Sequence, residues 1–281
     1  NEEGARFAPP MMGSGTFVGH FVLNEMLSST DLNGVSVADA LTADQLLNNI
    51  AYRTDRPISA YLESHIEQGP ILEKEKKIVG IVTGAQAVVW LNICVEGFQA
   101  HAGPTPMDYR KDAFLAAAEV ALVAEQTAIE QGPLARMTIG QSIVDNPSRN
   151  VIPGKVELWI DIRHPDEKIL EKIVALVKIR AADIATKRQV IIQFEPVWEM
   201  SVTHFTPFLI NALRTAAKLR NVDAIDIVSG AGHDALYMAT KYPTAMLFIP
   251  CKNGISHNES ENIDQGHAAK GCQILYDVVL P

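Results

Sequence analysis

Two histidines and a pair of adjacent carboxylates lie far apart in this sequence, each near a glycine. They are Glu2 with Glu3, His65, and His257. Imidazole and carboxylate groups bind zinc, manganese and similar ions, which activate water for hydrolysis near neutral pH. One of two adjacent carboxylates could bind such an ion while the other takes a proton from water. Singly, each group has a structural alternative, a solvated acidic segment or a hydrogen-bonded histidine, but together they are typical of a hydrolytic metal site.

A second group of residues could bind the substrate. His101 lies among small residues ahead of Pro104 and Pro106, which would stiffen its loop and let the imidazole polarise a carbonyl group. The alternative is an incidental histidine in a loop that leads into a helix. Asn150 precedes a turn and Arg163 ends the next expected strand. The Asn150 side chain can hydrogen-bond both polar ends of a ligand amide, and the Arg163 guanidinium suits a ligand carboxylate. A surface arginine is the alternative for Arg163.

The turn Gly230-Ala231-Gly232-His233 joins an expected strand to an expected helix. It resembles a phosphate loop only superficially, because the third glycine and the lysine of such loops are absent. This argues against a nucleotide site. We expect the turn, with His233, to contact substrate or to support a metal ligand.

The elements that must position these residues fall into three blocks, 1–86, 87–199 and 200–281. The middle block predicts strand, helix, strand, strand, helix, strand, which is the split βαβ pattern of a ferredoxin-like unit. Its expected elements are strands at 88–96, 136–144, 156–163 and 190–194 and helices at 111–130 and 166–187. The outer blocks predict α/β alternation, with strands at 58–64, 77–83, 224–228 and 244–249 and helices at 18–26, 42–50, 207–220, 264–279 and near 234. We therefore expect an α/β domain with an α+β domain inserted into it.

Composition limits the partners and the compartment. The formal net charge is −9 and the isoelectric point is about 5.4, which argues against nucleic acid and anionic membranes as partners. No apolar run approaches the roughly 20 residues of a membrane-spanning helix. Three widely separated cysteines show no Cys-x-x-Cys spacing, which predicts a reducing, cytoplasmic environment without a disulfide framework.

Seven strings together resemble the amidohydrolases that cleave N-carbamoyl amino acids, allantoate and related ureido acids, in the aminoacylase and carboxypeptidase-like zinc peptidase clan. They occur in the family's order and cover nearly the whole chain. The strings are Asn-Glu-Glu-Gly at 1–4, His-Ile-Glu-Gln-Gly-Pro at 65–70, Ala-His-Ala-Gly-Pro-Thr-Pro-Met at 100–107, Asn-Val-Ile-Pro-Gly at 150–154, Asp-Ile-Arg at 161–163, Ser-Gly-Ala-Gly-His-Asp at 229–234 and Gly-Ile-Ser-His-Asn at 254–258.

The resemblance implies a site with two divalent ions: zinc, manganese, cobalt or nickel. Glu2 would be the general base, Glu3 and His257 would bind one ion, and His65 would bind the other, with Gln68 close to the substrate. Family members carry a further His-x-Asp ligand segment before the Asn-Glu-Glu-Gly string, and this sequence starts after it. We therefore expect that this chain alone lacks part of the catalytic sheet, holds no complete dinuclear site and is inactive.

The resemblance also assigns the substrate-binding residues and a partner. Asn150 and Arg163 would hold the substrate carboxylate with the turn at 230–232, and His101 would stabilise the oxyanion of its own site or of a neighbouring one. Residues 87–199 would form a lid and dimerisation domain, giving a homodimer. The implied reaction is hydrolysis of the ureido bond with release of ammonia and carbon dioxide.

Several functions remain open at this point. The Gly-Pro-Thr-Pro string at 103–106 and the run at 251–257 favour N-carbamoyl-L-amino acids over allantoate or ureidoglycolate. A dipeptidase or aminoacylase-like hydrolase is a third enzymatic alternative. An inactive dimer that binds small carboxylates through Arg163 is the non-enzymatic one.

Overall fold

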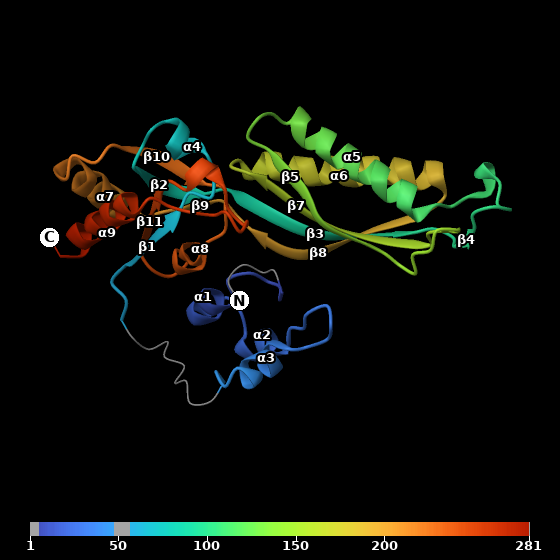
Figure 1. Ribbon diagram of the computed structural model, residues 1–281, viewed down its shortest axis with the longest axis horizontal. Helices are drawn as coiled ribbons and strands as arrows, with labels where there is room; N and C mark the ends of the chain where they lie inside the picture. Colours follow the sequence, from blue (N-terminus) through green and yellow to red (C-terminus); the bar gives the residue numbers. More distant parts are fainter. Residues whose placement is uncertain (1–5, 48–56, 281) are drawn as a thin grey trace. The chain divides into compact units, whose positions relative to one another are not determined.

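The computed structural model describes residues 6–47 and 57–280, shown in Figure 1. The chain divides into two compact units, which are described separately. The first unit combines residues of Asn1–Ala85 and Thr203–Pro281, and the second is Gln86–Val202.

The first unit is built on a mixed sheet in the order β1-β11-β2-β10, with β9 also paired to β2. The strands are β1 (Tyr61–Ile66), β2 (Val79–Ala85), β9 (Thr203–His204), β10 (Ala224–Ser229) and β11 (Thr244–Ile249). β1 runs parallel to β11 and β10 runs parallel to β2, whereas β11 and β2 are antiparallel. Every residue of β11 is buried, and all but Thr244 are apolar, as expected of a strand covered on both faces.

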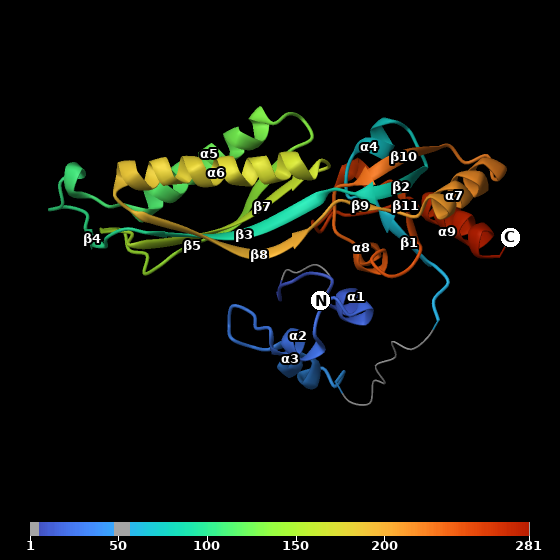
Figure 2. The ribbon, with the colours of Figure 1, turned by 180° about the vertical axis from the view of Figure 1, so that it is seen from behind.

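Helices cover both faces of this sheet. They include α7 (Pro207–Leu219), α8 (Asp234–Met238) and α9 (Gln265–Val279), seen from two sides in Figures 1 and 2, and α1 (Met12–Val18) lies next to α8. Gly271 of α9 packs close to Ser64, whereas the backbone amide of Ala235 in α8 donates a hydrogen bond to the Glu63 side chain. Successive side chains of a strand point to opposite faces, so α8 and α9 lie on opposite sides of β1. α1 packs against α8, and α7 packs beside α9.

Two helices near the start of the chain differ from the expected ones. α1 ends at Val18, because Gly19 adopts a left-handed conformation with φ of 84°, and α2 (Leu23–Ser28) begins after a break. The prediction of one helix at 18–26 is therefore wrong. α3 (Val37–Ala43) starts earlier than the predicted helix at 42–50, because Ser36 and Asp39 form a reciprocal capping box. Residues 48–50 of that prediction lie outside the described residues.

The second unit has a four-stranded antiparallel sheet in the order β5-β7-β3-β8. Its elements are β3 (Ala87–Glu96), α5 (Ala113–Glu130), β5 (Arg136–Val144), β7 (Lys155–His164), α6 (Glu167–Arg188) and β8 (Ile191–Met200). Asp112 and Asp166 cap the two helices with their side chains. This order of elements is that of a split βαβ unit. A short pair, β4 (Ala100–His101) with β6 (Val151–Ile152), and the single turn η1 (Met107–Tyr109) extend from it.

One face of this second sheet is packed and the other carries polar and aromatic side chains. Positions 156, 158, 160 and 162 of β7 are buried in a core shared with α5 and α6, while the intervening positions are partly exposed. The second face bears Trp90, Trp159 and Trp198 together with Asp161 and Arg163, since directly paired residues share a face. No helix within the described ranges is both long enough and apolar enough to cross a membrane.

Candidate functional site

His65 lies near the carboxyl end of β1, beside the buried strand β11. Its direct partner in the parallel register is Phe248, and its Nδ1 atom lies 2.9 Å from the carbonyl oxygen of Ile66. Its ring centroid is 4.6 Å from that of His233. The structure therefore brings together two imidazoles that are distant in sequence, at a sheet edge where α/β proteins commonly bind ligands.

Glu63 joins this pair and was not predicted as a site residue. Its carboxylate accepts a hydrogen bond from the Ala235 backbone amide at 2.9 Å and from the Tyr61 hydroxyl at 3.1 Å, and it lies 3.8 Å from His233 Nδ1. Burial raises the pKa of Glu63 above its ordinary range, against the effect of these hydrogen bonds. The signal for Glu63 was its spacing, because residues 63 and 65 of a strand share one face.

The turn at 229–234 is braced from within. The Ser229 hydroxyl accepts a hydrogen bond from the Ala231 amide at 3.1 Å, lies 2.9 Å from the Ala231 carbonyl oxygen, and lies 2.9 Å from His233 Nε2. The His233 residue is only 4% exposed. Asp234 Oδ1 is buried without a hydrogen-bond partner among the described residues. The imidazole of His233 thus supports the turn from beneath, between Ser229 and Glu63.

Gln68 stands in a tight turn that a buried carboxylate holds in place. Its backbone has a φ of 57°, in the left-handed region. The preceding residue, Glu67, accepts hydrogen bonds from the amides of Ile71 and Leu72, both at 2.7 Å, and so fixes the start of α4 (Ile71–Lys74). Sequence reasoning missed Glu67, because nothing in its spacing distinguishes it from an exposed glutamate.

His257 comes close to Gln68 although 189 residues separate them in sequence. Gln68 Nε2 lies 3.4 Å from His257 Nε2 and donates to Ser256 Oγ at 3.2 Å. Glu261 holds this loop, because its Oε2 atom accepts from the Ser256 hydroxyl at 2.7 Å and from the His257 amide at 3.1 Å. The Ser256 hydrogen bond lowers the pKa of Glu261 and keeps it ionised. The hydrogen bond from the His257 amide to Glu261 stabilises a residue in the left-handed region, because His257 has a φ of 54°.

His101 and Asn150 lie together in the second unit, on the paired segments β4 and β6. The Ala102 amide donates to the Asn150 carbonyl oxygen at 2.8 Å, and His101 is paired with Val151. His101 Nδ1 accepts from the Gly103 amide at 3.1 Å. Both His101 and Asn150 are exposed. His101 is therefore exposed at the end of the short strand β4, ahead of the two prolines.

Arg163 lies on β7 of the four-stranded sheet, at the end far from the β4–β6 pair. Its Nε and Nη2 atoms donate to Asp161 at 2.8 and 2.6 Å, and the Trp90 indole N–H donates to Asp161 Oδ2 at 2.6 Å. β7 begins at Lys155, beside the β4–β6 pair, and an antiparallel strand rises about 3.4 Å per residue. Eight residues along β7 therefore separate Arg163 from that end by roughly 27 Å. The second unit alone does not bring Arg163 together with His101 and Asn150.

The donor chemistry of the described residues fits a divalent ion. Imidazoles such as His65 and His257 are good ligands for zinc and manganese. Within 6–47 and 57–280, no group of three or more histidine, cysteine, aspartate or glutamate side chains is arranged to hold an ion. Glu2 and Glu3, predicted as base and ligand, lie outside the described residues. Within the described part, His65 and His257 have the donor chemistry of such ligands.

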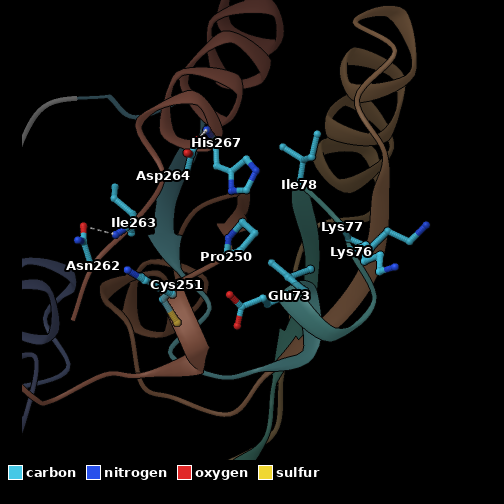
Figure 3. Close-up of a pocket in the computed structure, with 12 residues that line it drawn as sticks. Glu73, Lys76, Lys77, Ile78, Pro250, Cys251, Asn262, Ile263, Asp264 and His267 are labelled. Carbon is cyan, nitrogen blue, oxygen red and sulfur yellow. Dashed lines mark hydrogen bonds between the residues drawn. The ribbon is translucent and has the colours of Figure 1, made fainter. Parts of the chain in front are cut away.

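A shallow depression of about 570 Å³ lies elsewhere in the first unit, beside α4 and the start of α9 (Figure 3). None of the residues that line it belongs to the predicted site. It is lined by Leu72, Glu73, Lys76, Lys77, Ile78, Pro250, Cys251, Lys252, Asn262, Ile263, Asp264 and His267. η2 (Lys252–Gly254), on its rim, begins the loop that leads to His257.

Comparison with known proteins places these residues in a family context. Residues 1–280 match the family described as Peptidase family M20/M25/M40. The chain is 41% identical over 280 residues to the N-carbamoyl-L-amino-acid amidohydrolase of Rhizobium meliloti, covering 100% of this chain and 67% of that protein. It is 34% identical over 284 residues to a ureidoglycolate hydrolase of Oryza sativa subsp. japonica, covering 98% and 58% of the two chains.

Solved structures agree with this assignment. An amidase of the hydantoinase/carbamoylase family from Burkholderia vietnamiensis matches with a TM-score of 0.95 and 40% identity, covering 100% of this chain and 68% of that one. AtUAH in complex with glyoxylate matches with a TM-score of 0.91 and 33% identity, covering 99% and 68%. The predicted α/β class is confirmed, and the chain spans about two thirds of the length of the two solved proteins. This chain therefore belongs to peptidase family M20/M25/M40, in the subfamily of N-carbamoyl-L-amino-acid and allantoate amidohydrolases.

Proposed function

We propose that this chain carries metal-binding and substrate-binding residues of an amidohydrolase that cleaves the ureido C–N bond of N-carbamoyl-L-amino acids, releasing ammonia and carbon dioxide. The observation that carries the proposal is the approach of Gln68 to His257, at 3.4 Å, in a chain 41% identical to an N-carbamoyl-L-amino-acid amidohydrolase. The approach brings a neutral amide donor beside an imidazole that suits a metal.

Each group has a role that its chemistry supports. His65 would hold one divalent ion, and His257 with Glu3 would hold the other. When bound, the ions supply Lewis acidity toward water and the ureido carbonyl. Glu2 would accept the proton of the attacking water and pass it to the leaving nitrogen.

Four further contacts would orient the substrate. The glycine turn at 230–232, supported by His233, would border the substrate beside Gln68. Arg163 and Asn150 would bind the carboxylate and the amide end, and His101 would donate a hydrogen bond to the developing oxyanion.

The dimensions of the second unit favour a site shared between two copies of the chain. The ureido carbon of an N-carbamoyl amino acid is three bonds from its carboxylate carbon, or at most about 4.3 Å. The separation of roughly 27 Å along β7 between Arg163 and the end that carries His101 and Asn150 is several times larger. One chain cannot bring both ends of its second unit to one such substrate. We therefore propose a homodimer in which His101 and Asn150 of each protomer complete the site of its partner, with the second unit as lid and dimerisation domain.

Ammonia release tests the reaction. The complete, metal-loaded protein is assayed for ammonia release with N-carbamoyl-L-amino acids, allantoate and ureidoglycolate, and for release of free amino acids with dipeptides, whose hydrolysis yields no ammonia. The proposal predicts the highest kcat/KM for a carbamoyl amino acid. Turnover of dipeptides alone, or no turnover of any ureido acid, would contradict it.

Mixed dimers test the shared site. His101→Ala and Arg163→Ala proteins are each expected to be nearly inactive. Random exchange of protomers makes half of the dimers mixed, each with one intact site, so about a quarter of the wild-type activity should return. No recovery after exchange, verified by mass spectrometry of differently tagged protomers, would mean that each site comes from one chain.

The second candidate function is hydrolysis of allantoate or ureidoglycolate. It is favoured by the 34% identity to a ureidoglycolate hydrolase and by the close fold match to AtUAH with glyoxylate bound. The substrate panel above separates the two candidates directly. A kcat/KM for either ureide that exceeds every carbamoyl amino acid would select this second function.

A further inference from the structure

The Asp161 carboxylate binds one edge of the Arg163 guanidinium and is itself hydrogen-bonded to the Trp90 indole. Asp161 accepts two hydrogen bonds from the Nε and Nη2 atoms of Arg163, at 2.8 and 2.6 Å, and a third from the Trp90 indole at 2.6 Å. The side chains of Arg163 and Asp161 are 25% and 23% exposed, so the pair is partly shielded from water. Charge-assisted hydrogen bonds of this length are strong and directional.

The sheet itself sets this geometry. Trp90 on β3 is paired directly with Asp161 on β7, and Arg163 lies two residues further along the same face of β7. Trp90 is also packed edge-on against Trp198 of β8, with ring centroids 5.1 Å apart. Three adjacent strands therefore fix the indole, the indole fixes the carboxylate, and the carboxylate fixes one edge of the guanidinium.

A pre-held arginine binds a ligand differently from a free one. Ordering a long side chain on binding costs free energy, and this cost is avoided when the side chain is already ordered. The guanidinium is planar and can pair with a carboxylate along either of two edges. Asp161 pairs with the edge formed by Nε and Nη2, so it fixes the plane in which the guanidinium lies. Asp161 also offsets the positive charge, which weakens attraction for small anions that need no particular orientation.

We propose that Asp161 and Trp90 are positioning residues that orient Arg163 for the substrate carboxylate and make it selective for a correctly placed carboxylate over simple anions. This inference rests on the proposed role of Arg163. It adds two residues to the recognition of the carboxylate.

The test is a comparison of KM with inhibition by chloride in the complete, metal-loaded protein, using whichever carboxylate substrate it turns over best. Asp161→Asn should raise KM by up to about tenfold, the cost of ordering one long side chain, with a smaller change in kcat. Inhibition by chloride should become stronger, because the positive charge is no longer offset. Trp90→Phe removes the indole donor together with part of the ring that packs against Trp198, and it should raise KM in the same direction by less.

Matched controls lie on the same face of the same strand. Glu157→Gln neutralises a carboxylate that is paired with Lys155 at 2.7 Å, and Trp159→Phe makes the same aromatic exchange as Trp90→Phe. Both should leave KM and chloride inhibition at wild-type values. In Asp161→Asn, the affinity for substrate should fall while the affinity for chloride rises. General damage to the fold would instead weaken the binding of both.

The Arg163→Ala variant separates the proposed role of Arg163 from the positioning role of Asp161 and Trp90. If Arg163→Ala leaves KM unchanged, the proposed carboxylate role of Arg163 is wrong and this inference falls with it. If Arg163→Ala raises KM but Asp161→Asn and Trp90→Phe behave like their controls, only the positioning inference is overturned. In an Arg163→Lys background, Asp161→Asn should have little further effect on KM, because the planar fork is already gone.

Discussion

Glu67 holds the turn between β1 and α4, and we predict that Glu67→Gln loosens this turn while the rest of the protein stays folded. The residue is 8% exposed, and its two oxygens accept from the amides of Ile71 and Leu72, both at 2.7 Å. Leu72 is fully buried. The turn carries Gln68, so its stability bears directly on the candidate site.

The magnitude follows from the two hydrogen bonds. A hydrogen bond to an ionised acceptor contributes about 1.5–3 kcal/mol, and an unsatisfied buried amide costs about 1–3 kcal/mol. Glutamine keeps one oxygen acceptor without its charge and turns an NH₂ group toward the second amide. We therefore expect the free energy of opening of this turn to fall by about 2–4 kcal/mol. At 1.4 kcal/mol per factor of ten, amide exchange at residues 71 and 72 should accelerate roughly 30- to 700-fold.

Hydrogen exchange measured by NMR resolves this locally. All three tryptophans lie in the second unit, so the urea transition followed by tryptophan fluorescence should not move. Glu73→Gln, on the exposed side of α4, is the matched control and should leave exchange at 71 and 72 unchanged. An acceleration below about threefold in Glu67→Gln would refute the reasoning, because it would correspond to less than about 0.7 kcal/mol.

Three shorter predictions follow from the same structure. The hydrogen bond from Arg188 lowers the pKa of Glu119 below its ordinary 4.5, so the stabilisation it gives is present above that value and lost as pH falls through the folded pKa. The urea midpoint from tryptophan fluorescence should therefore fall less between pH 6 and pH 3 in Glu119→Gln than in the wild type. Ile160→Ala, at a position 2% exposed, should cost about 2–5 kcal/mol in the same assay, whereas Ile191→Ala, at 58% exposed, should cost far less. Chelation should abolish ammonia release and added zinc or manganese should restore it, and Glu261→Gln should weaken metal affinity by about 10- to 100-fold in a competition titration.

Regular elements with strong periodicity were predictable from sequence. The strands at 136–144 and 244–249 have the predicted ends, and the long helix α6 differs from its prediction by one residue at each end. In these segments the local pattern and the tertiary packing favour the same structure, so no long-range contact has to override a local preference.

Prediction failed where a short-range cap decided the structure. The helix expected at 18–26 is broken because Gly19 takes a left-handed conformation. The next helix starts at Val37, where Ser36 and Asp39 cap each other. Such caps contribute about 1 kcal/mol, which is enough to move a helix end but too little to appear in hydrophobic periodicity.

By itself, the sequence determined the α/β class, the family and the residue types that suit a hydrolytic metal site, because these are carried by motifs and local patterns. Only the tertiary structure decided which carboxylates support them. The sequence assigned no role to four of them, although two stand in the family strings at 65–70 and 161–163: Glu63 behind His233, Glu67 in the turn of Gln68, Glu261 beside His257 and Asp161 against Arg163. They become specific through partners brought close by strand pairing and loop closure, and a hydrogen bond is defined by distance and direction, which residue spacing along the chain does not encode.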